Sequence, residues 1–323
     1  MIPVHLRAVP SPSDEGLGDF GRAMLAGLAA RPRAISPKFF YDAAGSALFD
    51  QICGLPEYYP TRTEIGILDR HASEIAACVG EGAEIVEFGA GSVLKIRRLL
   101  DALERPARFL PIDISGEHLH AAAAALRIDY PKLAIEPVVA DFTKPLALPK
   151  PLGSGRRFGF FPGSSIGNFT PEEAVRFLRQ AAVLLRGGGM LIGVDLVKDP
   201  QRLHAAYNDA AGVTAAFNRN LLVRANRELG ADFDPESFYH YAFFNPQASR
   251  IEMHLISSRR QRVTVAGQWF DFEDGEPIHT ENSYKFTVDG FRRLATLAGF
   301  RPGPVWCDEA ASFSLHWLAA PGG

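Results

Sequence analysis

The chain has 323 residues, of which 47% are hydrophobic and 22% are charged, and its formal net charge at pH 7 is -3. These proportions are typical of a soluble globular protein with one large domain or two smaller ones. The small net charge provides no electrostatic footprint for nucleic acid or an anionic membrane, so we expect neither as a partner.

The middle third of the chain alternates strand-like and helix-like runs, which is typical of βαβ units and a parallel sheet. The run 170–185 predicts a helix with Thr170 as N-cap, Pro171 in its first position and Glu173 closing a capping box. A second helix is expected at 92–103, where apolar residues recur near helical spacing. The five expected strands lie within 83–92, 108–115, 135–142, 157–165 and 190–197.

After Lys198 the pattern changes to helical runs and then to alternating or β-branched runs, which do not continue the βαβ order. We therefore expect an α/β protein with two parts. Residues 61–197 are predicted to form a Rossmann-like core. Residues 1–60 and 198–323 are predicted to form a second, mixed α+β domain packed on that core.

Small and acidic residues mark the ends of the first three expected strands. Gly89 belongs to a G-x-G turn, but Leu94 stands where the third glycine of a dinucleotide fingerprint would fall, which disfavours a nicotinamide cofactor. Asp113 is placed to meet ribose hydroxyls, and Asp141 an adenine amino group, with Phe142 covering the ring. A helix-capping role is the alternative for such aspartates. A ribonucleoside without a pyrophosphate fits best, and S-adenosylmethionine is the expected cofactor.

The stretch FFPGSSIGNF at 160–169 follows the fourth strand with a glycine-rich turn that carries one uncharged amide, Asn168. Such a turn needs no function, because Gly and Ser form turns and Asn tolerates a left-handed backbone. When the acceptor of a methyl group is an amine, however, its nitrogen needs a neutral lone pair held in line with the methyl group. An amide can accept an N–H and donate to a carboxylate without holding the amine as ammonium. We therefore expect Asn168 opposite the methyl group of the cofactor.

Longer segments carry a resemblance to a known family. The G-x-G turn, the acids after the second and third strands and the segment RGGGMLIGVDLV resemble class I S-adenosylmethionine-dependent methyltransferases. Segments 36–68, 161–169, 196–222 and 280–286 are similar to the ergothioneine-pathway L-histidine Nα-methyltransferases. The resemblance implies a second domain built from both ends of the chain. It also implies conversion of histidine to its trimethylated betaine, hercynine, as the first step of ergothioneine biosynthesis.

The resemblance assigns roles to individual residues. It implies that Asn168 and Tyr207 hold the α-amino and carboxylate end of histidine, and that Glu281 with Ser283 receives the imidazole. Lys95 would face the methionyl carboxylate of the cofactor. The expected catalytic residues are Asn168 and Tyr41, and the expected substrate-binding residues are Tyr58, Asn168, Tyr207, Met253, Glu281 and Ser283. The expected cofactor-binding residues are Gly89, Lys95, Asp113, Asp141 and Phe142.

Three other functions stay open at this point. A methyltransferase of another aromatic amino acid, such as tryptophan, would use the same mechanism. A thioether at Met253 beside the ring would limit room for an indole, although this Met can equally be a residue that only fills the core. A nucleic-acid amino-methyltransferase would have a similar turn, but no proline pair with an aromatic residue follows Asn168. A non-catalytic S-adenosylmethionine-binding module is the third.

The remaining expectations concern compartment, metals and assembly. The first sixteen residues lack the apolar run of a signal peptide, so we expect a cytoplasmic protein acting as a monomer. Cys53, Cys78 and Cys307 form no C-x-x-C pair and predict three reduced thiols. His118 and His120, the closest pair of histidines in the sequence, have no metal-binding motif around them, so no metal is expected.

Overall fold

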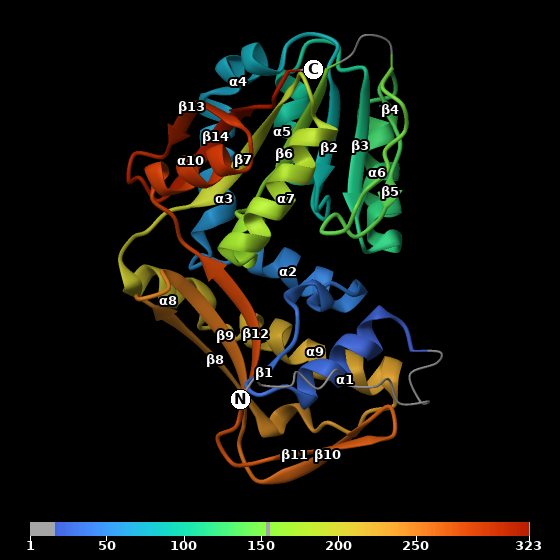
Figure 1. Cartoon of the computed structure of the whole chain (residues 1–323), viewed down its shortest axis with the longest axis vertical. Coiled ribbons are helices and arrows are strands. Elements are labelled where there is room, and N and C mark those ends of the chain that lie inside the picture. The colour runs from blue at the N-terminus through green and yellow to red at the C-terminus, as the bar shows by residue number, and fades with distance from the viewer. Residues whose placement is uncertain (1–16, 153–155, 323) are drawn as a thin grey trace, which may run out of the picture.

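An eight-stranded sheet forms the upper half of the molecule in Figure 1. The computed structural model describes residues 17–152 and 156–322, so the expectations about the first sixteen residues lie outside the described part. The strand order is β13-β14-β7-β6-β2-β3-β4, and β5 also pairs with β3. The strands are β2 (Glu84–Phe88), β3 (Arg108–Asp113), β4 (Ala134–Ile135), β5 (Val138–Val139), β6 (Arg157–Phe161), β7 (Gly189–Asp195), β13 (Arg301–Cys307) and β14 (Phe313–Ala319).

This order places the switch point of a doubly wound sheet between β2 and β6, because the chain moves outward on opposite sides of that pair. Strands β2 and β7 are buried along their whole length, as expected for central parallel strands. One face of the sheet packs against α3 (Tyr59–Arg70), α4 (Ala72–Val79), α5 (Val93–Ala102) and α6 (Gly116–Asp129). The other face packs against α7 (Pro171–Leu184) and α10 (Val288–Leu297).

A four-stranded sheet, ordered β1-β12-β9-β8, lies below the first in Figure 1, with the hairpin of β10 and β11 beneath it. Helices α1 (Asp19–Ala29), α2 (Ala43–Gly54), α8 (Pro200–Tyr207) and α9 (Val213–Leu229) share one apolar core with this sheet. The strands of this part are β1 (Arg33–Ala34), β8 (Phe238–Asn245), β9 (Arg250–Ser257), β10 (Gln261–Val265), β11 (Gln268–Phe272) and β12 (Pro277–Tyr284). Its short 3₁₀ turns are η2 (Pro37–Phe40) and η4 (Pro235–Ser237).

Local sequence signals are recovered at several of these elements. Thr170 and Glu173 form the reciprocal capping box at the start of α7, with Pro171 in the first position. The third expected strand is reduced to the two-residue strands β4 and β5, because Pro137 between them has no N–H to donate to a ladder.

The predicted domain boundary is wrong at its C-terminal end. Residues 198–323 were assigned to the second domain, yet β14 pairs antiparallel with β7 and β13 pairs with β14, so both strands extend the core sheet. Helix α10 covers the same face as α7. The physical reason is that the edge of β7 needs a partner, and the chain end supplies it after completing the second sheet.

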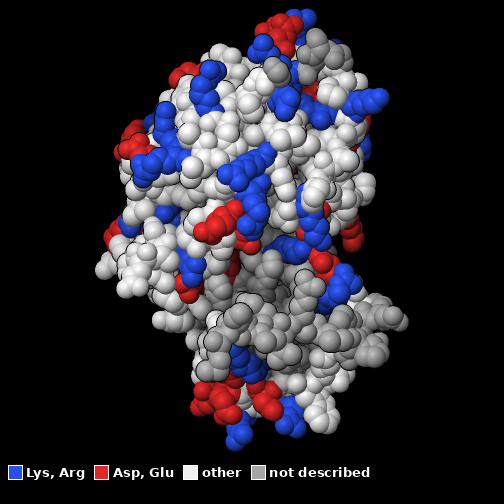
Figure 2. Space-filling view, in the orientation of Figure 1, with Lys and Arg blue, Asp and Glu red and all other residues white. Residues whose placement is uncertain are grey.

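The surface in Figure 2 intersperses Lys and Arg with Asp and Glu over the upper half of this face. In the part of the chain that the structure describes, no helix has the length and apolar character needed to cross a membrane. All three cysteines are free thiols.

Candidate functional site

The carboxyl ends of the strands beside the switch point border a large cavity between the two sheets. The expected cofactor residues that line it are Gly89, Lys95, Asp113, Asp141 and Phe142. Gly89 has a φ of 76°, a conformation that residues with side chains rarely adopt, and its N–H donates to Ile112 O at 2.9 Å. The ring of Phe142 lies 3.6 Å from the point where a Cβ on Gly89 would stand. The glycine turn therefore presents bare backbone beside an aromatic ring.

The two aspartates of this cavity differ in their surroundings. Asp113 accepts the N–H of Ser115 at 2.8 Å, but burial raises the pKa of its carboxyl above the ordinary value. Burial also acts to raise the pKa of Asp141, yet hydrogen bonds from Thr143 and Lys38 outweigh it and lower that pKa. Lys38 Nζ lies 3.0 Å from Asp141, so a residue of the lower part already contacts the predicted adenine acceptor.

Lys95 has a partner that sequence analysis missed. Its ammonium lies 2.6 Å from the carboxylate of Glu64 on α3, which is fully buried. Glu64 also accepts the backbone N–H of Gly163 at 2.8 Å. The carboxylate therefore joins the helix after the glycine turn to the turn after β6. Lys95 still lines the cavity, and the Glu64 carboxylate partly neutralises its charge.

A smaller cavity adjoins the larger one. The expected catalytic and substrate-binding residues that line it are Tyr41, Tyr58, Asn168, Tyr207, Met253, Glu281 and Ser283. Four of them, Tyr41, Tyr58, Asn168 and Glu281, border the larger cavity as well. The structure thus brings the complete predicted set together, from segments as distant in sequence as the end of η2 and β12. These four residues are among those at which the two cavities meet.

Asn168 ends the short 3₁₀ turn η3 (Ser165–Asn168) directly after β6. The turn begins with Ser164 in the left-handed region, at a φ of 57°. Ser164 Oγ accepts the backbone N–H of Asp195 at 2.8 Å, which anchors the turn to β7. A Cβ on Gly167 would lie 2.8 Å from Tyr284 O, so only glycine lets the turn approach β12 this closely. The backbone that carries Asn168 is therefore held on two sides.

Tyr41 and Tyr58 are neutral phenols in this pocket. Burial is the main cause that raises the pKa of each hydroxyl well above its ordinary value. Phe49 packs edge-on against both rings, with centroid distances of 5.6 Å to Tyr41 and 6.2 Å to Tyr58. The two hydroxyls can therefore donate or accept hydrogen bonds at neutral pH without carrying charge.

Glu281 and Ser283 alternate on β12, so both face the smaller cavity, and Met253 on β9 lies directly opposite Glu281 in the register. Burial raises the pKa of Glu281 to about 7, although the positive charge of Lys285 opposes the shift. The chain has no hydrogen bond to this carboxylate among the described residues. A buried carboxylate without a partner of its own is suited to accept a donor from a ligand.

Lys285 is the second residue that sequence analysis missed. Its ammonium, buried just past β12, lies 2.9 Å from Asp195, 2.7 Å from Ser283 Oγ and 3.2 Å from the Tyr207 hydroxyl. Tyr207 also bonds Ser283 Oγ at 2.7 Å. Burial alone would lower the pKa of Lys285, but Asp195 outweighs it and raises that pKa above the ordinary value. Two predicted substrate residues are thus oriented by one cation.

Asp195 at the end of β7 is the common partner of this network. The hydroxyl of Tyr59 lies 2.7 Å from the carboxylate, and Lys198 Nζ lies 2.5 Å from it. Burial is the largest cause that lowers the pKa of Lys198, to about 8. For Asp195 itself, burial acts to raise the pKa, and the two lysines outweigh it and lower that pKa. The carboxylate is therefore ionised and fully engaged.

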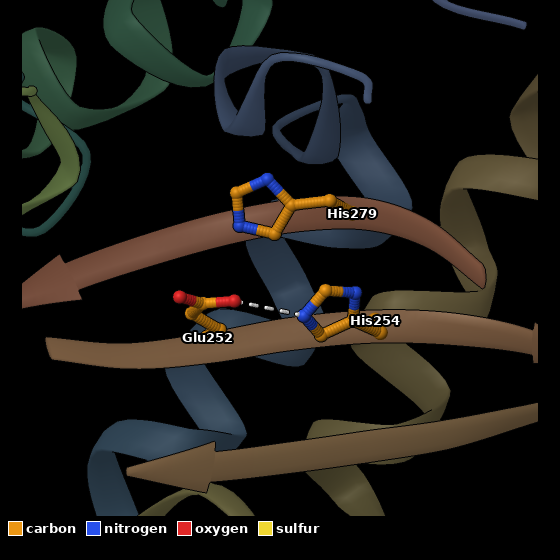
Figure 3. Close-up of side chains that lie close together, drawn as sticks. All are labelled: Glu252, His254 and His279. Carbon is orange, nitrogen blue, oxygen red and sulfur yellow. Dashed lines mark hydrogen bonds and ion pairs between the residues drawn. The ribbon is translucent and has the colours of Figure 1, made fainter. Parts of the chain in front are cut away.

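Sequence reasoning also missed a cluster on the opposite side of the second sheet. Glu252, His254 and His279 bring their side chains together there (Figure 3). His118 and His120, the closest pair of histidines in the sequence, are not part of it. His254 and His279 meet by strand pairing, and no spacing rule for a single helix or loop would find them.

The sequence of the chain is similar to those of known proteins. The model of a family described as "Histidine-specific methyltransferase, SAM-dependent" matches residues 20–320. The chain is 47% identical, over 91% of its length and 92% of the relative's, to histidine N-alpha-methyltransferase of Mycolicibacterium smegmatis. It is 44% identical, over 92% of its length and 94% of the relative's, to the protein of the same name from Mycobacterium tuberculosis.

The chain belongs to this family. It is therefore an S-adenosylmethionine-dependent methyltransferase, and its upper part is the Rossmann-like core of the class I enzymes. More distant relatives have other substrates in their names. The 4-dimethylallyltryptophan N-methyltransferase of Arthroderma benhamiae is 26% identical over 91% of each chain.

We predict that Lys285→Met destabilises the protein by about 3 to 5 kcal/mol, because it removes one partner of a buried ion pair. In combination with Asp195→Asn the loss should be smaller than the sum of the single losses, since the two groups compensate each other. Urea denaturation of the four proteins measures this coupling. Arg262→Met, which opens an exposed pair with Asp271, is the control and should change stability little. Additive single losses would contradict the network.

Proposed function

We propose that this enzyme is an L-histidine Nα-methyltransferase. It transfers three methyl groups from S-adenosylmethionine to the α-amino group and produces Nα,Nα,Nα-trimethylhistidine, hercynine, the first step of ergothioneine biosynthesis. The observation that carries the proposal is the pairing of a buried carboxylate, Glu281, with a hydroxyl, Ser283, in a cavity that Asn168 also lines. Relatives named as histidine N-alpha-methyltransferases support it.

At the amine end, the proposed catalytic residues are Asn168 and Tyr41. Both border the two cavities where they meet, and both are uncharged. An α-amine must lose its proton before it can attack a methyl group, and a carboxylate beside it would retain that proton. The amide oxygen of Asn168 can accept an amine N–H while its NH₂ donates to the substrate carboxylate. Tyr58 completes this end with a hydroxyl that positions the carboxylate, whereas the hydroxyl of Tyr207, also expected here, is engaged by Lys285 and Ser283.

At the ring end, hydrogen-bond counting assigns a direction to Ser283. Lys285 donates to both Ser283 Oγ and the Tyr207 hydroxyl, and Tyr207 donates to Ser283 Oγ. A serine oxygen has two lone pairs and one proton, so with both lone pairs occupied the proton is left for a ligand. We infer that Ser283 donates a hydrogen bond to the substrate while Glu281 accepts one.

A donor beside an acceptor matches the two nitrogens of a neutral imidazole. One ring N–H faces Glu281 and the other nitrogen accepts from Ser283. Indole has one N–H and no acceptor nitrogen, so it would leave the Ser283 proton unpaired, and Met253 occupies the space beside Glu281. Histidine is therefore favoured over tryptophan as substrate, although a distant relative is named for a tryptophan derivative.

The larger cavity is the proposed cofactor site. The positive-φ turn at Gly89, the ring of Phe142 and the acid Asp113 at the end of β3 fit a ribonucleoside. When bound, S-adenosylmethionine supplies an electrophilic methyl group. The Asp141 carboxylate would accept the adenine amino group while keeping its ion pair with Lys38. Lys95 would face the methionyl carboxylate.

The division of labour between the two parts is also a proposal. Within the described residues, we assign cofactor binding to 61–197 and substrate binding to 17–60 and 198–286, with 287–322 returned to the core. We further propose that the protein works as a cytoplasmic monomer on a small molecule and not on nucleic acid. Its balanced charge and free cysteines are consistent with that setting.

Mass spectrometry of a reaction with S-adenosylmethionine tests the proposed activity. With L-histidine we expect successive additions of one, two and three methyl groups and no further product, because the quaternary nitrogen has no lone pair. Tryptophan and other single amino acids should give little or no product. Methylation of tryptophan in preference to histidine would support the alternative enzyme. Cofactor binding without product from any amino acid would identify a non-catalytic module.

We predict that Asn168→Ala lowers kcat by about 100-fold or more, since a misoriented amine loses the advantage of in-line positioning. Binding of S-adenosylhomocysteine should change little, which separates a substrate-orienting role from collapse of the cofactor site. Steady-state kinetics and calorimetry on purified protein measure the two effects. Wild-type kcat in Asn168→Ala would refute the proposed role.

We predict that histidine affinity falls as pH decreases below about 7, because the carboxylate of Glu281, with its pKa raised to about 7, then becomes protonated. Glu281→Gln should bind histidine roughly tenfold more weakly at pH 8, where a charged acceptor is replaced by a neutral one. Calorimetry at pH 6 and pH 8 in the presence of S-adenosylhomocysteine tests both points. The ring of histidine titrates in either protein, so equal pH dependence in the two would show that Glu281 is not the titrating group.

A further inference from the structure

The outer face of the second sheet carries a group of ligand-type side chains to which the proposed methyl transfer assigns no role, although one of them, His279, also borders the larger cavity. Glu252 and His254 stand two residues apart on β9 and therefore share one face, opposite to that of Met253. His279 on β12 lies directly across from His254 in the register, with ring centroids 4.9 Å apart (Figure 3). One nitrogen of each ring and one carboxylate oxygen all lie within 4.8 Å of one another.

Hydrogen bonds hold one oxygen of the Glu252 carboxylate, and the other oxygen faces the ring of His254. Oε1 accepts from Arg250 at 2.7 Å and from Asn245 at 2.9 Å. Oε2 lies 3.2 Å from His254 Nε2. Outer hydrogen bonds of this kind orient the ligating carboxylates of metal sites.

The cluster has unsatisfied polar atoms among the described residues. His254 Nδ1 and Asn282 Oδ1 are buried and have no hydrogen-bond partner there. Asn282 lies opposite Glu252 in the register and neighbours the ring of His279. Each unpaired buried group is unfavourable, so the arrangement is incomplete as a purely structural network.

We propose that Glu252, His254 and His279 bind a divalent transition-metal ion of the zinc class. Two imidazole nitrogens and one carboxylate oxygen are a ligand set that zinc accepts, with the remaining position open to solvent or a small ligand. Asn282 Oδ1 is an acceptor for the Nδ1–H of His279, which would leave Nε2 of that ring free to coordinate. In each neutral ring the proton moves to the non-coordinating nitrogen, so binding releases no net proton.

Coordination needs a small local movement. Zinc lies about 2.0 to 2.1 Å from each nitrogen, so tetrahedral ligand atoms are about 3.3 Å apart and those of the cluster must approach one another by up to about 1.5 Å. Both rings are partly exposed, which permits this rotation. His279 Nε2 lies 3.0 Å from the backbone oxygen of Glu281, and an ion there would replace that hydrogen bond. The positive charge of Arg250, which donates to the Glu252 carboxylate, repels a metal cation and therefore lowers the expected affinity for zinc.

Calorimetric titration of the full, untagged chain with ZnCl₂ tests the site, without histidine because free histidine chelates zinc. We expect one saturable zinc per wild-type chain and a loss of affinity of about tenfold or more in His254→Ala and in His279→Ala. His120→Ala removes an exposed histidine on α6 and is the matched control, with affinity unchanged. Visible absorption of bound Co²⁺ gives an independent report on nitrogen and oxygen coordination.

Circular dichroism of each variant shows whether it folds. Should either alanine variant unfold, Glu252→Gln is the replacement test, because an amide keeps the size of the side chain and its bond to Asn245 but ligates zinc poorly. The proposal is overturned if the wild-type chain shows no saturable zinc binding. It is equally overturned if the folded cluster variants bind zinc as tightly as His120→Ala does. Both outcomes are read from zinc binding without histidine and not from turnover, so failure of this proposal is distinguishable from failure of the proposed function.

Discussion

One buried carboxylate connects the two halves of this enzyme. Asp195 ends the central strand β7, and its side chain is bound by Lys285, which follows β12 of the other sheet. The backbone makes the same connection, because the N–H of Phe286 donates to Asp195 O at 3.0 Å. Two buried lysines and the Tyr59 hydroxyl offset the desolvation of this anion. The relative position of the larger and the smaller cavity depends on this pairing.

The same pairing reaches the substrate through hydroxyl groups. The three N–H donors of Lys285 are directed at Asp195, Ser283 and Tyr207. The lysine would thereby set the direction of the hydrogen bond that Ser283 offers, and it need not contact the ligand itself. Under the proposed function, selectivity for a ring with one donor and one acceptor nitrogen would then follow from the number of protons as well as from shape. At the proposed amine end, Asn168 and Tyr41 would hold a nucleophile without charge.

Strand β12 serves two faces. Its inner residues Glu281 and Ser283 line the smaller cavity, while His279 on its outer face meets His254. The register shifts between His279 and Glu281, which lets the strand present these side chains to opposite sides within two residues. The proposed metal site and the proposed ring pocket therefore share a backbone segment while differing in chemistry.

The sequence by itself determined the features that depend on neighbours along the chain. The capping box of Thr170 and Glu173, the strands β2, β3, β6 and β7, the positive-φ turn at Gly89 and the family resemblance are all local patterns, and the residues predicted for each cavity were named from them. Residues predicted after the core strands converge on the larger cavity because the carboxyl ends of parallel strands meet at one edge of the sheet. The smaller cavity also needs Met253, Glu281 and Ser283 from the antiparallel second sheet, whose position the alternation of elements did not imply.

Only the tertiary structure decided the interactions between distant segments. The pairing of β14 with β7, the partners Glu64 for Lys95 and Asp195 for Lys285, and the meeting of His254 with His279 have no local signal. The physical reason is that buried charges and sheet edges are satisfied by whichever group the fold brings near. A single charged residue in a sequence carries no mark of its partner, and a strand carries no mark of its neighbour in the sheet.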